Sequence, residues 1–152
     1  AQEAEIVTRY EAAMKFADTE VEARVRAARF LYATGNLPRA LELLNSNAIQ
    51  ASDKELRYFA ELIRGQVLLA SNRPDDAIAA FRAALAAWPG AQSARVALMT
   101  LLINRGNREE AAALAETSQT GAADEFDPWW LYWLGDFRAY PAIVEKLRSL
   151  AR

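Results

Sequence analysis

The stretch NRPDDAIAAF, residues 72–81, recurs in two degenerate copies along the chain: GNLPRALELL at residues 35–44 and GNREEAAALA at residues 106–115. Each copy begins with Gly or Asn, the residues that most readily adopt the left-handed conformation in which many helices end. An alanine follows five residues after the start of each copy, at Ala40, Ala77 and Ala111. These stretches predict three units of helix, tight turn and helix, with a small residue where the paired helices touch.

The copies are spaced almost regularly. Gly35 and Asn72 are 37 residues apart, and Asn72 and Gly106 are 34 residues apart. A three-residue insertion in the polar connection NSNAIQASD, residues 45–53, explains the difference. A leucine also stands four residues before each turn, at Leu31, Leu68 and Leu102. This internal period is typical of a helical repeat protein.

The composition predicts an all-α fold. The chain has 152 residues, of which 53% are apolar and 25% charged, as in an ordinary soluble globular domain. Helix-forming residues dominate, and strand-like alternation of β-branched residues is nowhere sustained. Capping chemistry marks helix starts at Thr19 with Glu22, Ser52 with Glu55, Asn107 with Glu110, and Asp127 before Pro128.

The missing residue types narrow the chemistry. Cys and His are absent, which removes thiolate nucleophiles, zinc–thiolate sites and the commonest general base. We therefore expect no enzyme activity, no cofactor and no metal. Eighteen basic against twenty acidic residues give a net charge of −2, which argues against a nucleic-acid partner. No apolar run approaches the roughly 20 residues that span a bilayer, so direct membrane insertion is not expected.

The sequence leaves the compartment and the oligomeric state open. The start AQEAEIVTRY has no signal-peptide pattern, yet Ala-Gln-Glu also suits the mature end of an exported chain. A soluble protein of the cytoplasm or the periplasm is expected. The excess of alanine and of arginine over lysine suggests a GC-rich bacterial genome.

Two acidic pairs raise the question of catalysis. The pairs Asp75-Asp76 and Glu109-Glu110 could serve acid–base or metal chemistry, but each is placed in the first turn of a predicted helix. Carboxylates are favoured there by the helix dipole, and we prefer this structural interpretation. A group of arginines, Arg24, Arg26 and Arg29, is interpreted as a solvated helix edge.

The segment from 58 to 91 resembles a tetratricopeptide repeat. The residues that carry the resemblance are Gly65, Leu68, Ala77, Phe81, Ala84 and Pro89. The flanking segments 21–57 and 92–125 match in part, through Ala28, Leu31, Ala40, Leu44, Met99, Leu102, Ala111 and Ala115, with Met99 replacing the usual small residue. The resemblance implies one domain over 1–152, a right-handed superhelical array of antiparallel helix pairs, an α-solenoid of about three repeats plus terminal capping helices.

The two ends allow alternatives. Residues 1–18 form an N-terminal helix with apolar residues at Ile6, Tyr10 and Ala13, spaced as in the second helix of a repeat. This helix is either the remainder of a unit in a longer protein or a plain capping helix. Residues 126–152, with Ile143, Leu147 and Leu150 in the same spacing, form either a degenerate fourth repeat or a C-terminal cap.

The resemblance also implies a function. First helices of such repeats line a concave groove that holds peptides or helices of partner proteins, so we expect a non-catalytic scaffold for protein–protein interaction. The alternative is an accessory domain that positions the catalytic region of a larger enzyme or of a secretion or assembly protein. Helical spacing predicts that the groove is lined by Arg29, Tyr32, Phe59, Leu62, Gln66, Leu69, Ser93, Val96 and Thr100, with Glu22, Val25 and Ile103 at equivalent positions.

The predicted groove lacks the cations that family members use to clamp a terminal carboxylate. Val25, Leu62 and Val96 occupy the matching positions, so we predict no such clamp. We expect an extended or helical segment, held by apolar contacts with Tyr32, Phe59, Leu62 and Leu69, while Arg29 and Gln66 fix its register. The alternative for Leu62 and Leu69 is packing between neighbouring first helices.

The stretch FDPWWLYWLGDF, residues 126–137, contains three of the four tryptophans. A helix starting at Asp127-Pro128 would place Trp130, Trp133 and Phe137 on one face, which we assign to the core of the terminal cap. Trp129 and Tyr132 turn to the other side. They are predicted to form an exposed aromatic patch.

Overall fold

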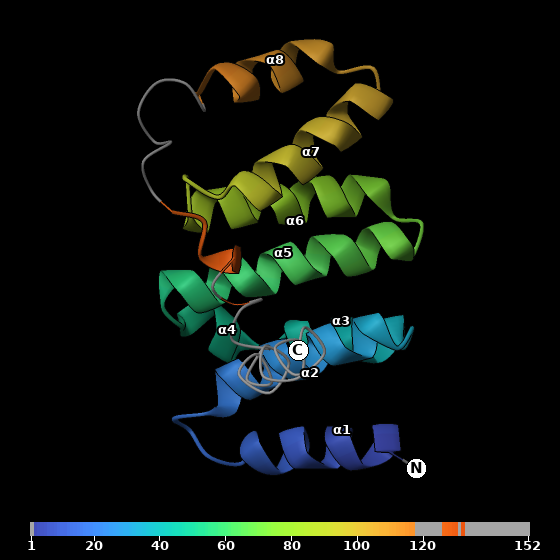
Figure 1. Ribbon diagram of the computed structural model, residues 1–152, viewed down its shortest axis with the longest axis vertical. Coiled ribbons are helices and arrows are strands. Elements are labelled where there is room, and N and C mark those ends of the chain that lie inside the picture. Colours follow the sequence, from blue (N-terminus) through green and yellow to red (C-terminus); the bar gives the residue numbers. More distant parts are fainter. Residues whose placement is uncertain (1, 118–125, 131, 133–152) are drawn as a thin grey trace, which may run out of the picture.

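The computed structural model describes residues 2–117, 126–130 and 132. Helices stack in these ranges from α1 at one end to α8 at the other, and no strand occurs in them (Figure 1). Trp133 and Phe137 of the predicted cap core, and Ile143, Leu147 and Leu150, lie outside the described residues. The helices are α1 (Gln2–Ala13), α2 (Glu20–Ala33), α3 (Leu37–Leu44), α4 (Asn47–Ala51), α5 (Lys54–Ala70), α6 (Pro74–Ala87), α7 (Gln92–Asn104) and α8 (Arg108–Thr117).

The three repeated turns form as predicted. Gly35, Asn72 and Gly106 have φ angles of 84°, 57° and 80°, and each ends the first helix of a pair. The side chains of Asn36 and Asn107 then cap the second helices by accepting the backbone N–H groups of Arg39 and Glu110. The turns produce three helix pairs, which are α2 with α3, α5 with α6, and α7 with α8. The fold class is all-α, as predicted.

Two predicted caps are wrong. The Thr19 side chain donates to the carbonyls of Ala13 and Phe16 and makes no cap bond to α2. The cap of α5 is Asp53, whose carboxylate accepts the N–H of Leu56 at 2.9 Å. Ser52 is used by the insertion, which folds as α4: its hydroxyl donates to the carbonyl of Ile49 at 2.6 Å.

The core runs continuously through the stack. Ala28, Ala40, Ala77 and Ala84 are fully buried between helices, as their matches to the repeat pattern predict. At one end of the stack Val7 and Tyr10 of α1, and Met14 just after this helix, pack against this core. Of these, Tyr10 belongs to the apolar set that the spacing predicted for this helix. Helices α5 and α6 approach closely at Gly65, where an added Cβ would lie 2.7 Å from Cδ1 of Phe81.

That approach leaves no room for a side chain at Gly65. Gly65→Ala should lower the free energy of unfolding by about 1–3 kcal/mol, because the Phe81 ring has to move. Urea denaturation followed by circular dichroism measures this loss. In a Phe81→Leu background the same substitution should cost less; an equal cost in both backgrounds would show that the ring is not the obstacle.

Candidate functional site

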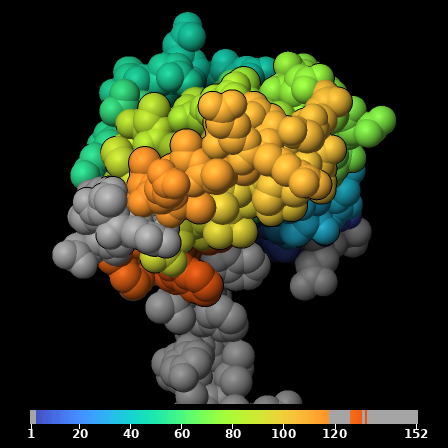
Figure 2. All heavy atoms as spheres, turned by 90° about the horizontal axis from the view of Figure 1, so that it is seen from above, coloured from blue at the N-terminus to red at the C-terminus, as the bar shows by residue number. Residues whose placement is uncertain are grey.

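Residues 126–130 and 132, here named the tryptophan segment, lie against the N-terminal half of α5 (Figure 1). Residues 128–130 form a helical turn. Figure 2 looks down on α8 and shows the orange-red residues of the segment on one side of the stack, next to α7. The segment contacts the predicted groove residues Phe59, Ser93 and Arg29. Part of the predicted groove is therefore covered by the chain itself.

Asp127 anchors the segment. Its side chain is 3% exposed. One carboxylate oxygen, Oδ1, accepts the Tyr58 hydroxyl at 2.7 Å and the Trp129 N–H at 2.9 Å, and Oδ2 accepts the Ser93 N–H at 2.8 Å. The predicted helix start at Asp127 is confirmed, and the same carboxylate joins α5 to α7.

The N-terminus of α7 explains why a carboxylate is held there. The residue at the N-cap of α7 is Ala91, which has no side-chain acceptor for the free N–H groups of the first turn. Ser93 belongs to that turn, and the positive end of the helix dipole favours an anion beside it. Asp127 thus caps two helical segments at once.

The donors to this carboxylate are neutral. Burial, and then the hydrogen bond to Asp127, raise the pKa of Tyr58 well above its ordinary value, so its hydroxyl stays protonated and donates. The sequence predicted that the groove has no cationic clamp for the terminal carboxylate of a partner. The neutral site around Asp127 does not test this statement, which stays a prediction. A carboxylate site formed by Tyr58 and the start of α7 was not predicted from the sequence. The lack of a capping residue at Ala91 could have indicated that an acceptor from elsewhere in the chain is needed there.

The aromatic rings form a cluster. Trp129 and Tyr132 stack with centroids 5.3 Å apart and planes 10° apart. The Tyr132 ring lies 4.5 Å from the Phe59 ring on α5. From α2, the Cζ of Arg26 lies 5.0 Å from the Tyr132 centroid, and that of Arg29 lies 5.6 Å from the centroids of both Trp129 and Tyr132. The rings are therefore held between an aromatic surface and two cations.

The structure corrects the assignment of the tryptophans. Trp129 and Tyr132 are each 7% exposed, so the predicted exposed aromatic patch is wrong. Trp130 is 57% exposed, so its assignment to a cap core is wrong as well. The prediction assumed that this helix stacks like the first helix of a further repeat. Instead Asp127 and the arginines hold its opposite face against the groove.

The electrostatics of the cluster follow from burial. Burial raises the pKa of Tyr132 to about 12, so this ring is neutral at physiological pH. Burial lowers the pKa of Arg29. Burial also lowers the pKa of Arg26, but the hydrogen bond to Glu22 and the charge interactions with Tyr132, Glu22 and Tyr10 together raise this pKa above its ordinary value. Both arginines remain cationic at neutral pH. The interpretation of Arg26 and Arg29 as a solvated helix edge is wrong, because each is partly buried against a ring of the tryptophan segment.

The tryptophan segment does not completely fill the site that α2, α5 and α7 form for it, which we call its seat. Tyr132 lines two hollows of about 350 and 290 Å³, and Arg26 lines both. Leu56 and Phe59 contribute to the larger hollow. The buried Tyr132 hydroxyl has no hydrogen-bond partner among the described residues. An unsatisfied hydroxyl and unfilled space both weaken a contact.

The remaining predicted groove residues divide into two groups. Leu62 is 1% exposed and belongs to the core, as the packing alternative states, whereas Leu69 is 44% exposed and does not. Tyr32 is half-buried. We name as the open half of the groove the predicted groove positions of α5 and α7 that are partly or fully accessible, apart from Ser93, whose backbone binds Asp127: Gln66, Leu69, Val96, Thr100 and Ile103.

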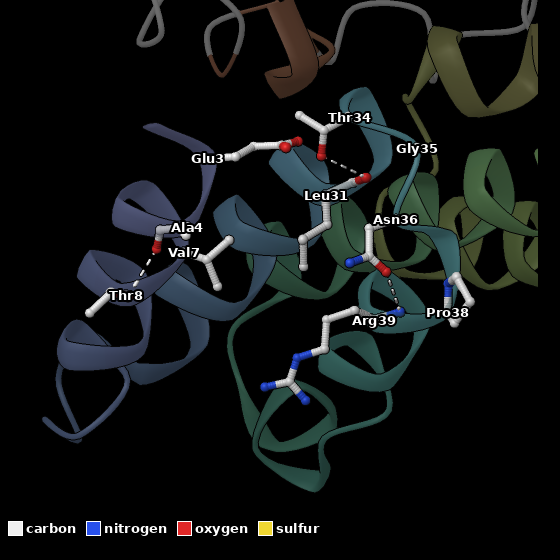
Figure 3. Close-up of a pocket in the computed structure, with 10 residues that line it drawn as sticks. All are labelled: Glu3, Ala4, Val7, Thr8, Leu31, Thr34, Gly35, Asn36, Pro38 and Arg39. Carbon is white, nitrogen blue, oxygen red and sulfur yellow. Dashed lines mark hydrogen bonds between the residues drawn. The ribbon is translucent and has the colours of Figure 1, made fainter. Parts of the chain in front are cut away.

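A separate hollow of about 830 Å³ lies between α1 and the turn from α2 to α3 (Figure 3). Three of its polar side chains form hydrogen bonds within the chain. Thr8 donates to the Ala4 carbonyl, Thr34 to the Leu31 carbonyl, and Asn36 accepts from Arg39, as the dashed lines show. This hollow therefore offers little specific chemistry to a ligand.

Three residues of the two acidic pairs, Asp75, Asp76 and Glu110, form ion pairs with arginines. Asp75 pairs with Arg105, and Glu110 pairs with Arg82 at 2.6 Å, so each contact joins neighbouring helix pairs. Asp76 pairs with Arg73 at 2.7 Å. In the described ranges no group of three or more acidic residues could hold a metal ion, and no helix there is both long and apolar enough to cross a bilayer.

Comparison with known families agrees with this architecture. Two family models, each described as a tetratricopeptide repeat, match residues 21–46 and residues 68–130. The chain belongs to the tetratricopeptide repeat family. The second match ends inside the tryptophan segment. No curated protein and no solved structure matches the chain.

The anchor can be tested by substitution. Asp127→Ala should destabilise the aromatic cluster by about 1–3 kcal/mol, because the buried Tyr58 hydroxyl and the Ser93 N–H lose their acceptor. The urea midpoint of the near-ultraviolet circular dichroism signal measures the effect. A Tyr58→Phe background should reduce the cost, and the exposed Asp18→Ala should change stability by less than about 0.5 kcal/mol. Equal losses from Asp127→Ala and Asp18→Ala would contradict the anchor.

Proposed function

We propose that the concave face of this protein binds an apolar-bearing segment of a partner protein, and that the partner makes its first contacts with the open half of the groove. Tetratricopeptide repeats generally mediate protein–protein interaction, and their family is typically non-catalytic. The finer proposal concerns which surface of this chain does so.

One observation carries the proposal: a row of exposed apolar side chains follows two neighbouring first helices. Val96 and Ile103 on α7 are 62% and 50% exposed, and Leu69 on α5 is 44% exposed. Val96, Thr100 and Ile103 share one face of α7, because they are spaced four and three residues apart. The same face begins with Ser93, whose backbone binds Asp127, so the row continues the filled part of the groove.

The chemistry of the open half favours a protein partner. It contains no cation, which does not suit a phosphate backbone. Gln66 offers amide groups that can pair with a partner's backbone, while the Thr100 hydroxyl donates to the Val96 carbonyl at 2.9 Å within α7. Apolar residues with interspersed polar groups are typical of a surface that holds an amphipathic helix or an extended segment.

Introducing charge tests the open half. Val96→Glu combined with Ile103→Glu should abolish partner binding without unfolding the chain, because both positions are exposed and charges oppose apolar docking. Phe16→Glu is the matched control: Phe16 is 64% exposed, apolar and outside the groove. The measurement is quantitative affinity capture from native lysate, with a photo-crosslinking residue at position 100 to map contact. Retention of every crosslinked protein by the Val96→Glu, Ile103→Glu variant would sink the proposal.

A further inference from the structure

We infer that the tryptophan segment is an internal ligand of the groove, and that the partner segment that displaces it has the same chemistry: a carboxylate that caps a helical turn, followed by aromatic rings two and five residues later. These positions correspond to Asp127, Trp129 and Tyr132. The inference rests on the proposed function and specifies the partner's chemistry.

The first argument is the origin of the contacts. The segment is held by α2 through Arg26 and Arg29 and by α5 through Tyr58 and Phe59, and by α7 through the Ser93 N–H. These three helices are the first helices of the three pairs. The described turn is thus bound across the repeats, in the manner of a helical peptide in a groove.

The second argument is that the groove is built to receive this chemistry. The first turn of α7 lacks a side-chain acceptor of its own, and the Tyr58 hydroxyl points to the same carboxylate. Two arginines lie over the ring positions. Without an occupant these donors and cations lose a carboxylate and two rings, so the groove selects an acidic residue before aromatic ones.

The third argument is that the internal ligand fits imperfectly. The Tyr132 hydroxyl is buried without a partner among the described residues, and Tyr132 lines two hollows of about 350 and 290 Å³. A partner with phenylalanine at this position avoids the unsatisfied hydroxyl. A partner that also reaches Val96 and Ile103 gains apolar contacts that the described segment does not make. Both features let an external segment compete.

A peptide in trans tests the inference. The probe is the synthetic peptide DEFDPWWLYW, residues 124–133, titrated by calorimetry into the full chain. Three forms of the chain are compared: wild type; Asp127→Ala with Trp129→Ala and Tyr132→Ala, here called the emptied chain, which removes the carboxylate and both rings from the site; and Tyr132→Phe, which keeps the ring but removes the unsatisfied hydroxyl. Helical circular dichroism verifies the fold of each form, and a scrambled peptide is the control.

Competition for one seat predicts opposite effects of the two chain variants. The emptied chain should bind the peptide at least about tenfold more tightly than wild type, because its seat is free. Tyr132→Phe in the chain should weaken peptide binding, whereas the same change in the peptide should strengthen it by about fivefold or more. Replacing the aspartate of the peptide that corresponds to Asp127 with alanine should abolish binding to the emptied chain.

Three results would overturn the inference. One is an emptied chain that is helical but binds no better than wild type. The second result applies if the emptied chain loses its helical signal. The Tyr132→Phe chain is then the test, and a peptide affinity equal to that of the wild-type chain would refute the competition. The third is a concentration-dependent dimer of the wild-type chain that is lost on emptying the seat, which would assign the contact to exchange between copies. If capture still depends on Val96 and Ile103, such failures leave the proposed function intact; capture indifferent to those residues refutes the proposed function itself.

Discussion

The predicted groove depends on paired helices that approach closely at small residues. Gly65 leaves no room for a Cβ beneath the Phe81 ring, and the buried Ala40, Ala77 and Ala111 mark the same position in each of the three pairs. Close packing of this kind fixes the relative positions of α2, α5 and α7 within narrow limits. The side chains that these helices direct to the concave side, from Arg29 to Ser93, are consequently held in a fixed arrangement. The proposed binding at that surface depends on this packing, although none of the small residues would contact the partner.

Within the groove, a buried carboxylate decides where the tryptophan segment sits. A buried charge is tolerated only when it is hydrogen-bonded, and Asp127 finds its donors on α5 and at the start of α7. Its position then directs Trp129 and Tyr132 toward Phe59 and the arginines, and leaves Trp130 outside. The same contact supplies the cap that α7 lacks. A single interaction therefore stabilises a repeat and occupies the groove.

The sequence was informative where structure is determined locally. Gly35, Asn72 and Gly106 predicted the turns because left-handed helix ends depend on the residue itself. The faces of Trp129 and Trp130 were predicted wrongly, because they depend on hydrogen bonds to Ser93 and Tyr58, which are 34 and 69 residues away from Asp127. Leu62 and Leu69 show the same limit: both fit the groove spacing, but only the position of the neighbouring helices decides that one is buried and the other exposed.

The central claim is that a carboxylate of the chain's own tryptophan segment occupies the site at the start of α7. Amide hydrogen exchange of Ser93 tests it most directly, because this N–H has no intrahelical acceptor and is held by Asp127 alone among the described residues. The account predicts slow exchange in the wild-type chain and fast exchange after Asp127→Ala, with the amides in the middle of α7 unchanged. Fast exchange of the Ser93 amide in the wild-type chain would contradict it.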